Sequence, residues 1–421
     1  MIAEASDRII RIGLDDTDHP ESGCTTASFD DLLRSIENQV VGFRLIERRL
    51  VRLWPFAVRR TRGNGALSAI IQIPENQRNS FNSVCDEWFE GLLRETAKFP
   101  PSPVRAAPVL LTSEGQLPEE WYWDTVRGHV ELEPRLQEIN SLSCIIRSGD
   151  ECWGAVGASA AMAWQPTEDS TWELISWRDD SMIGKQRIVS SEVVSLMERE
   201  HSETFMNRDP TADRGLIAPR TPCPVLYGIR GATEASVEAA HLWLQFRSDV
   251  EHSPRWAAHR TNQLSDDHVR GVSLGTVITL PLETKGAHSH IAAYCGGLRA
   301  DLVAFSEGGP VNRLLRRLLP GDRIAWVGLT APDGSVHLER LALVDCVPRV
   351  VARPICCGRT MRSAGAGQTL RCQFCRREAE RTWVSRGIDL RALDLVGNWS
   401  EPYPSNRRHL AKPLELDAPN L

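Results

Sequence analysis

The chain has 421 residues, of which 42% are hydrophobic and 25% are charged, and its formal net charge is −6. This length predicts two to four domains of ordinary soluble composition. No apolar run is long enough to span a bilayer, and residues 1–8 are too polar and too short for a signal peptide. We therefore expect a cytoplasmic protein with no membrane partner.

The charge is unevenly distributed along the chain. From Arg349 to Asp417 there are thirteen Lys/Arg and seven Asp/Glu, a net charge of +6, so the remainder carries −12. A basic C-terminal module on an acidic body favours a local contact with a polyanion. A solvated surface of mixed charge accounts for the same asymmetry equally well.

An acidic turn follows the first predicted strand. Residues 8–14 alternate and are rich in isoleucine, which predicts a strand that runs into Asp15, Asp16 and Asp18. Three carboxylates so close together repel one another, and Mg²⁺ is the usual compensating cation where phosphates are handled. Taken alone, the pattern also fits an exposed acidic turn.

A helix start is predicted directly after that turn. The sequence Gly23-Cys24-Thr25-Thr26 precedes a helix-like stretch, and the hydroxyl of Thr25 is a suitable N-cap. Backbone N–H groups and hydroxyls at a helix start can bind a phosphate. A strand, an acidic turn and a hydroxyl-bearing helix start in succession favour a functional site over an exposed turn.

The next elements are two strands at 48–53 and 67–73, joined by the segment Arg59-Arg60-Thr61-Arg62-Gly63-Asn64-Gly65-Ala66. Glycines allow a backbone to approach a ligand and arginines bind phosphate, although a solvated loop explains the segment as well. Residues 80–98 show helical spacing, and residues 100–108 form a proline-rich loop. The small-residue run 154–162 predicts a tightly packed helix or a backbone close to a ligand.

After about residue 255 the pattern changes to short strand-like runs separated by turns. Five of them in some 90 residues suit a small barrel such as an OB-fold. The runs are 275–280, 288–294, 299–305, 323–329 and 336–345.

The segment from Arg349 onward is rich in cysteine and arginine and has little periodic core. Cys372 and Cys375 have knuckle spacing, and Cys356 and Cys357 lie about 15 residues upstream, which favours a zinc site. Because the first two cysteines are adjacent, three alternatives stay open: a strained site that uses all four, a site that borrows another ligand, or a metal-free remnant.

The C-terminal tail carries a basic run beside Tyr403. It comprises Arg407, Arg408, His409 and Lys412. Such a run suits phosphate contact with a stacking option, although by itself an ordinary basic tail is the simpler interpretation.

Taken in order, these segments resemble the tRNA(Ile2) 2-agmatinylcytidine synthetase family along nearly the whole chain. The matching blocks are residues 13–18 with 23–26, 61–66, 204–209, 216–219, 224–231, Arg260-Thr261-Asn262-Gln263 with 266–268, the cysteine cluster, and 407–413. The ordered set, rather than any single block, carries the resemblance.

The resemblance implies an α+β multidomain protein. A kinase-like α/β domain (1–195, possibly interleaved with the next domain) packs with a ferredoxin-like portion (196–255). An OB-fold barrel that binds tRNA (256–347) and a small zinc ribbon with a basic tail (348–421) follow.

The resemblance also implies the reaction and its residues. The C2 oxygen of the wobble cytidine of an isoleucine tRNA with a CAU anticodon is activated with ATP, and the amine of agmatine then replaces it. Asp15, Asp16 and Asp18 hold Mg²⁺, and Thr25 matches a threonine that is itself phosphorylated. Gly23, Thr26, Arg60, Arg62 and Asn64 face ATP or phosphate. Arg260, Asn262, Gln263, Arg407, Arg408, His409 and Lys412 contact tRNA, and Cys356, Cys357, Cys372 and Cys375 bind Zn²⁺.

Two departures leave other hypotheses open. Pro354 stands where the family has the first cysteine of its knuckle, and residues 154–162 match the family's small-residue segment only loosely. The alternatives are a divergent paralogue with another amine or tRNA, an RNA-binding protein without activity, and a small-molecule kinase with an appended barrel. The intact acidic triad and Thr25 favour the ligase.

Overall fold

The computed structural model describes residues 7–20, 22–60, 63–100, 102, 105–347, 353–365, 368–379 and 395–421. The chain forms two compact units. Unit 1 comprises Met1–Val269 and Pro404–Lys412, and unit 2 comprises Arg270–Tyr403 and Pro413–Leu421. Within the described ranges, no helix combines the length and the apolar character that a membrane crossing needs.

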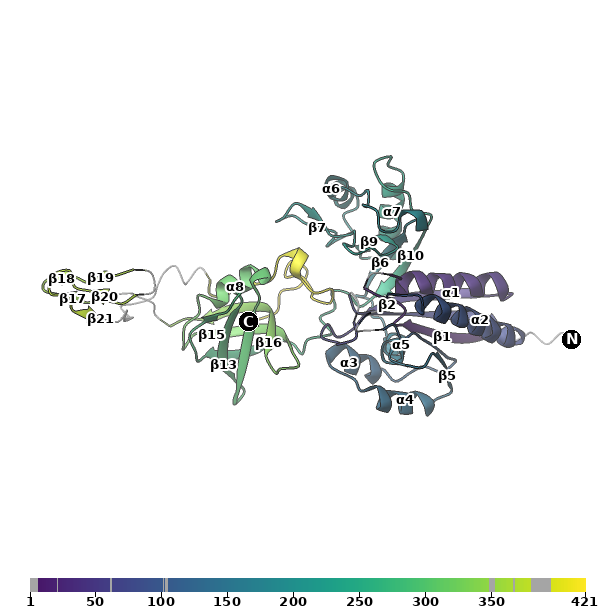
Figure 1. The fold of residues 1–421 in the computed structure, drawn as a ribbon, viewed down its shortest axis with the longest axis horizontal. Helices are drawn as coiled ribbons and strands as arrows, with labels where there is room; N and C mark the ends of the chain where they lie inside the picture. Colours follow the sequence, from purple (N-terminus) through teal and green to yellow (C-terminus); the bar gives the residue numbers. More distant parts are fainter. Residues whose placement is uncertain are drawn as a thin grey trace. The chain divides into compact units, whose positions relative to one another are not determined.

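Unit 1 is built on one eight-stranded sheet (Figure 1). All neighbouring strands are antiparallel except β10 and β2, which are parallel and join the two halves of the sheet. The order across the sheet is β5 (Cys144–Ser148), β4 (Val109–Ser113), β1 (Asp7–Asp15), β3 (Gly65–Pro74), β2 (Arg44–Arg52), β10 (Arg255–Thr261), β6 (Thr171–Trp177) and β9 (Val225–Gly231).

Helices cover both faces of the first half of this sheet. Successive side chains of a strand point to opposite faces, so neighbouring residues enter different cores. Leu50, Leu67 and Leu110 pack with α1 (Thr25–Gln39) and α2 (Arg78–Thr96). Their neighbours Val51, Ala66 and Leu111 pack with α3 (Glu120–Arg127), α4 (Leu132–Asn140) and α5 (Gly154–Ala163).

The small-residue run forms α5, a helix buried along almost its whole length against β1, β3 and β4. A Cβ at Gly13 of β1 would lie 2.6 Å from the carbonyl oxygen of Ala158, so the helix touches the strand backbone. The predicted tightly packed helix is thus confirmed.

The second half of the sheet carries α6 (Ser191–Glu200) and α7 (Glu234–Gln245), which share a core with β6, β9 and β10. A short hairpin, β7 (Arg208–Asp209) with β8 (Arg214–Gly215), lies between α6 and β9 in the sequence. The structure differs here from the expected start of the barrel at residue 256. Strand β10 belongs to unit 1, because seven of its residues pair with β6.

Unit 2 contains a closed five-stranded barrel in the order β11-β15-β16-β14-β13, in which β13 pairs back to β11. The predicted strands are confirmed within three residues at each end. They are β11 (Ser273–Val277), β13 (Ser289–Cys295), β14 (Leu298–Ala304), β15 (Arg323–Thr330) and β16 (Val336–Asp345). Two short strands extend the sheet: β12 (Leu282–Glu283) pairs with β13, and β22 (Trp399–Ser400) pairs with β16. Helix α8 (Pro310–Leu315) packs into the barrel core.

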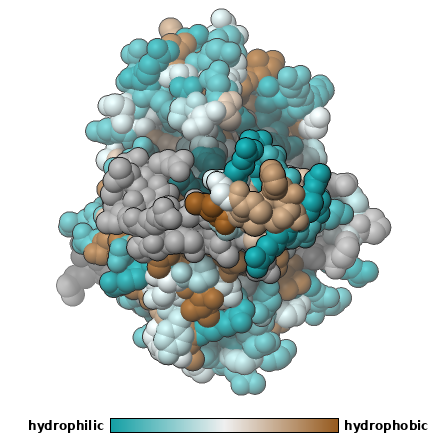
Figure 2. Space-filling model, turned by 90° about the vertical axis from the view of Figure 1, so that its left-hand side faces the viewer, coloured by the Kyte–Doolittle hydropathy of each residue, from teal (hydrophilic) through white to brown (hydrophobic). Residues whose placement is uncertain are grey.

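A small module of two-residue strands follows the barrel. It contains β17 (Ile355–Cys356), β18 (Arg359–Thr360), β19 (Arg362–Ser363), β20 (Leu370–Arg371) and β21 (Glu378–Ala379). Among the residues described for this module, Met361, Leu370 and Cys372 form the buried core, and Cys356 and Ala379 pack against them. Ile355 and Phe374 are more than 70% exposed, and Figure 2 shows apolar surface next to strongly hydrophilic surface on the side that faces the viewer.

Candidate active site

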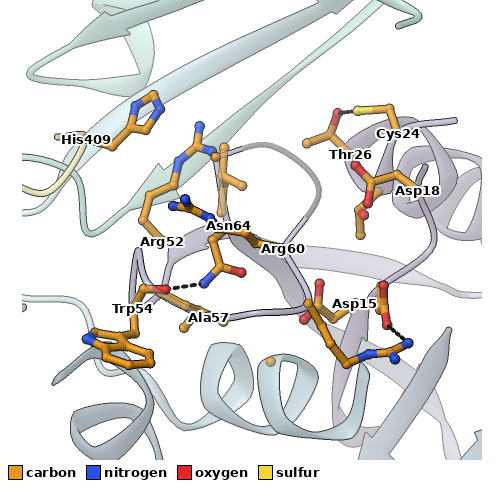
Figure 3. Close-up of a pocket in the computed structure, with 18 of the residues that line it drawn as sticks. Asp15, Asp18, Cys24, Thr26, Arg52, Trp54, Ala57, Arg60, Asn64 and His409 are labelled. Atoms are coloured by element: carbon orange, nitrogen blue, oxygen red, sulfur yellow. Dashed lines mark hydrogen bonds and ion pairs between the residues drawn. The ribbon is translucent and has the colours of Figure 1, made fainter. Parts of the chain in front are cut away.

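Unit 1 contains a cavity of about 710 Å³ between the end of β1, the start of α1 and the second half of the sheet. Most of the predicted catalytic and phosphate-binding residues line it: Asp15, Asp16, Asp18, Thr25, Thr26, Arg60 and Asn64. In Figure 3 the labelled acidic residues, Cys24 and Thr26 lie on one side, and Arg52 and His409 lie on the other. Segments distant in sequence therefore meet at one site.

The acidic turn is held by an unusual backbone. Asp15 is the last residue of β1, and Asp16 has a left-handed conformation with φ 58°. Such a φ is rare for a residue with a side chain, and strain of this kind gathers at functional sites. Gly23 has φ 68° and ends the turn, but it does not line the cavity.

The protein neutralises these carboxylates only in part. Burial, together with repulsion from Asp16, raises the pKa of Asp15 well above its ordinary value. Burial raises the pKa of Asp16 to about 7, although Arg59, 3.8 Å away, and the N–H of Ala107 oppose the shift. The site therefore favours an added cation, which would stabilise the ionised forms.

Helix α1 begins at Thr25, as predicted, but the N-cap residue is Cys24, whose side chain makes no capping hydrogen bond. Thr25 itself is buried and lines the cavity. The hydroxyl of Thr26 accepts a hydrogen bond of 3.1 Å from the indole N–H of Trp177 in β6. The predicted Thr25 cap is wrong by one position, because the helix already includes Thr25. The first N–H groups of a helix have no partner within the helix, and such a helix start can bind an anion.

The glycine-rich segment lies along the cavity. Arg60 is exposed and donates to the carbonyl of Pro55. Asn64 has φ 44° and donates to the carbonyl of Trp54 at 2.6 Å, so its amide braces the loop. Arg62 lies outside the described residues.

The wall across from the carboxylates is a buried charge network. Arg52 donates to Glu173 at 2.9 Å, and Arg230 lies 3.9 Å from the same carboxylate. Burial would raise the pKa of Glu173, but Arg52 and Arg230 lower it to about 2. Gln263 donates to Glu173 and accepts from Arg230 at 3.1 Å, which completes the network.

The basic tail returns to unit 1 and brings His409 to the cavity. The carbonyl of His409 accepts from the N–H of Leu264 at 3.0 Å, and Leu410 is buried in the core under α5. Repulsion from Arg52, reinforced by burial and by Arg230, lowers the pKa of His409 well below its usual range. Its imidazole is therefore neutral at pH 7.

The other residues expected at a tRNA interface do not line the cavity. Arg260 pairs with Glu47 at 3.3 Å. Asn262 and Gln263 are buried, and Asn262 bonds both backbone groups of Arg52, so a direct contact with tRNA would require these bonds to break. Arg407 contacts the sulfur of Met206, Arg408 stacks on Phe56, and the N–H of Lys412 donates to Asp266.

The four predicted zinc ligands converge in unit 2. The sulfur atoms of Cys356, Cys357, Cys372 and Cys375 all lie within 4.8 Å of one another. Tetrahedral zinc–thiolate geometry places sulfurs about 3.8 Å apart, so this set fits Zn²⁺. The adjacent cysteines can both face the centre because Cys357 has φ 51° and Gly358 has φ 71°, which turns the chain.

Sequence reasoning missed part of the cavity wall. Glu173 and Arg52 lie within ordinary strands and carry no local motif, and only the fold brings them to the site. Arg230 falls in the matching block 224–231, and Arg59 falls in the glycine-rich segment. Both segments were singled out in the sequence, so these two residues could have been predicted at the site. Trp177 donates a hydrogen bond to Thr26, which lies 151 positions away in the sequence, so no local pattern could indicate this contact.

The comparisons with known proteins agree over the full length. Sequence models of the TiaS TCKD domain and the TiaS FLD domain match residues 11–145 and 153–268. The tRNA(Ile2) 2-agmatinylcytidine synthetase TiaS of Archaeoglobus fulgidus is 30% identical over 96% of this chain and 96% of its own. That of Staphylothermus marinus is 29% identical over 97% and 93%.

Solved structures of TiaS proteins are also similar to this chain along nearly its whole length. The crystal structure of the TiaS–tRNA(Ile2)–ATP complex is 27% identical, covers 97% of both chains and has a TM-score of 0.78. The TiaS–tRNA(Ile2)–AMPCPP–agmatine complex is 25% identical, with the same coverage and a TM-score of 0.77. With these similarities along its whole length, the chain belongs to the tRNA(Ile2) 2-agmatinylcytidine synthetase family.

Proposed function

We propose that this protein is an ATP-dependent ligase that attaches agmatine to C2 of the wobble cytidine, position 34, of an isoleucine tRNA with a CAU anticodon. The observation that carries the proposal is the single cavity. It joins three carboxylates, the start of helix α1 and a cationic wall in a chain that matches the TiaS complexes with tRNA(Ile2), ATP and agmatine. A cytoplasmic location accords with this activity.

The carboxylates suit a magnesium–nucleotide complex. The four cysteines are the one group in the described ranges whose potential ligand atoms converge tightly, so Asp15, Asp16 and Asp18 do not form a closed cage. Mg²⁺ needs only one or two carboxylates when phosphates and water supply its other ligands. We assign these three residues to Mg²⁺ held together with ATP, where the ion would neutralise charge on the phosphates.

The start of α1 would hold the transferred phosphoryl group. The N-cap residue Cys24 makes no capping hydrogen bond to the N–H groups of the first turn, and Thr25 and Thr26, which add hydroxyls, line the same cavity. We assign Thr25 as the residue that receives phosphate during ATP cleavage. Arg60 and Asn64 would orient the nucleotide from the opposite loop.

The chemistry explains why ATP is required. The C2 oxygen of cytosine is a poor leaving group until a phosphoryl group is transferred to it. The primary amine of agmatine then attacks C2, the C2–O bond breaks, and phosphate leaves with the oxygen. The cytosine must be turned out of the anticodon stack to reach a cavity inside unit 1.

The remaining modules would bind the tRNA outside the cavity. We assign the barrel as an OB-fold, a frequent nucleic-acid-binding fold, and the parallel pair of β14 and β16 with α8 between β14 and β15 supports this assignment. We assign the cysteine module as a zinc ribbon that Zn²⁺ stabilises. The described part of the module has a core of three buried side chains, and so small a core needs an added stabilising element such as a metal ion.

The direct test is a transfer assay with purified protein, Mg·ATP, labelled agmatine and the isoleucine tRNA. Incorporation should require ATP and should disappear when the wobble cytidine is replaced by uridine. Tight tRNA binding without incorporation would point to another amine or to a binding protein, and a screen of primary amines would separate these two cases.

A further inference from the structure

Two buried asparagines make the same pair of hydrogen bonds behind the cavity wall. The side-chain amide of Asn262 accepts from the backbone N–H of Arg52 at 2.7 Å and donates to the carbonyl of the same residue at 2.9 Å. The amide of Asn207 does the same for Arg230, at 2.9 Å and 3.0 Å. Both asparagines are at most 1% exposed. Each therefore fixes the backbone of one arginine that lines the cavity.

Each asparagine takes the place of a neighbouring strand. The pairing of β10 with β2 ends where Thr261 meets Leu50, so Arg52 lies beyond the last pair of these two strands. Strand β9, which contains Arg230, is the last strand of the sheet. Backbone N–H and C=O groups at such places need other partners, and a side-chain amide offers both a donor and an acceptor. This need explains why an amide is buried here, but not why both amides bond to arginines of one site.

The other ends of the two arginines are fixed as well. The guanidinium of Arg52 donates to Glu173 at 2.9 Å. That of Arg230 lies 3.9 Å from the same carboxylate and donates to Gln263 at 3.1 Å. Each arginine is thus held at its backbone by an asparagine and at its guanidinium by the buried network. Because an arginine side chain otherwise adopts many rotamers, the two attachments restrict where its charge lies in the cavity.

A third residue orients the amide of Asn262. The hydroxyl of Tyr122 in α3 accepts from Nδ2 of Asn262 at 2.8 Å and donates to the carboxylate of Asp267 at 2.6 Å. Since a carboxylate only accepts hydrogen bonds, the single hydroxyl hydrogen of Tyr122 is directed at Asp267, and its oxygen accepts from the amide. The nitrogen end of the amide is thereby fixed, so its oxygen faces the N–H of Arg52.

We infer that Asn207 and Asn262 are positioning residues for the reaction, which act through Arg230 and Arg52 by holding their charges at fixed points of the cavity wall. This inference rests on the proposed function. Neither asparagine lines the cavity, so neither needs to touch a substrate. The resemblance implies a contact between Asn262 and tRNA, whereas its amide is committed to the backbone of Arg52. Charges that are fixed in advance stabilise a transition state without the cost of reorganisation.

The first test measures agmatine transfer at saturating ATP, with kcat and the KM for tRNA determined separately. The variants are Asn262→Ala, Asn207→Ala and Tyr122→Phe, and thermal unfolding shows whether each is folded. Asn312→Ala is the matched control. Asn312 is also a buried asparagine that donates to a backbone carbonyl, that of Ala304 at 2.8 Å, but it belongs to unit 2 and does not line the cavity.

Asn262→Ala and Asn207→Ala should each lower kcat about tenfold and leave the KM for tRNA within about twofold of wild type, because the loss concerns the transition state. Tyr122→Phe, which keeps the ring, should show a smaller loss of the same kind. In an Arg52→Lys background, Asn262→Ala should cost little more than Arg52→Lys alone, since both changes act through one group. Asn312→Ala should lower the melting temperature and keep kcat.

The second test measures hydrogen exchange of backbone N–H groups in the protein without tRNA or ATP. Exchange at Arg52 should be faster in Asn262→Ala, and exchange at Arg230 should be faster in Asn207→Ala, because each N–H loses its acceptor. Unchanged exchange at both arginines would overturn the inference. This measurement needs no activity, so an absence of agmatine transfer by wild type would contradict the proposed function and leave the two hydrogen-bonded pairs to be judged by exchange.

Two kinetic outcomes would also overturn the inference. A higher KM for tRNA with an unchanged kcat would assign Asn262 to a direct contact with RNA. Losses that simply multiply in the double variant would show that Asn262 does not act through Arg52. If the alanine variants fail to fold, Tyr122→Phe decides by the same criteria, because it removes only the hydroxyl that orients the amide of Asn262.

Discussion

Gly157 of α5 lies directly against the carboxylate of Asp15, so close that a methyl group at residue 157 would overlap the carboxylate Oδ2. The small-residue helix thus packs against the sheet and also contacts the carboxylate of Asp15, which we assign to the magnesium–nucleotide site. Positioning of a few tenths of an ångström matters at such a site, because small displacements of reacting groups slow catalysis strongly.

Gly157→Ala should therefore lower agmatine transfer on the order of a hundredfold while the protein remains folded. Initial rates at saturating ATP and tRNA would measure this loss. Gly91→Ala in α2 is a matched control, because a Cβ there meets nothing closer than 3.9 Å. It should keep full activity and gain about 0.5–1 kcal/mol of stability. Equal losses in both variants would contradict the role of Gly157.

Asp16→Asn should abolish most ATP cleavage and leave tRNA binding intact. The substitution keeps the size of the side chain and an acceptor for the N–H of Ala107, but it removes the negative charge that a magnesium–nucleotide complex needs. Phosphate release would measure cleavage, and a filter-binding titration would measure tRNA affinity. If both fell together, Asp16 would have a structural role instead.

Glu173 should make the stability of unit 1 depend on pH in the acid range. Its pKa is lowered in the folded state, to about 2 against 4.5 ordinarily, so its stabilising effect is complete above pH 5 and is lost as the pH falls toward 2. At pH 7 Glu173→Gln should lower the free energy of unfolding by roughly 3 kcal/mol.

Urea denaturation of both proteins between pH 7 and pH 3 tests this expectation. The difference between wild type and Glu173→Gln should shrink as the pH falls. Glu90→Gln, at an exposed surface pair, should follow wild type throughout. A difference independent of pH would show that packing, rather than charge, accounts for the effect.

Metal analysis should find one zinc ion per chain, lost in Cys372→Ser and retained in Cys85→Ser, whose thiol is buried in unit 1. Because the module has so little core, loss of zinc should expose residues 353–379 to proteolysis while the barrel stays resistant. Retention of zinc in Cys357→Ser would show that another ligand replaces that sulfur.

Patterns within short segments of the sequence predicted the strands, because the alternation of apolar and polar residues that forms a strand is visible in the segment itself. The alternation of residues 8–14 gave β1, and the barrel strands followed from short apolar runs between turns, because strand pairing needs little more than a buried face. The N-cap was misplaced by one residue, since Thr25 and Cys24 are both followed by the same helical pattern. Strand β10 lies in the sheet of unit 1 rather than in the barrel because seven of its residues pair with β6. This pairing joins distant segments, so the sequence near β10 does not indicate it.

The candidate site divides in the same way. The acidic turn and the helix start are contiguous in sequence, so their meeting at one site could be predicted. The wall formed by Arg52, Glu173 and Arg230 comes from three separate strands, and its charges pair only after the sheet has assembled. The tail was expected at the tRNA interface, yet His409 lines the cavity itself, because Leu410 anchors the chain in the core of unit 1.

The return of residues 404–412 to unit 1 also bears on the moment at which activity begins during synthesis. The first 269 residues can leave the ribosome and pair their strands while the barrel is still being translated, but the cavity then lacks His409. Only when the segment up to Lys412 has emerged and threaded back does His409 reach its position. A nascent chain is therefore an incomplete enzyme until translation has passed the barrel, and a frameshift late in the reading frame would remove part of the active site rather than a dispensable tail.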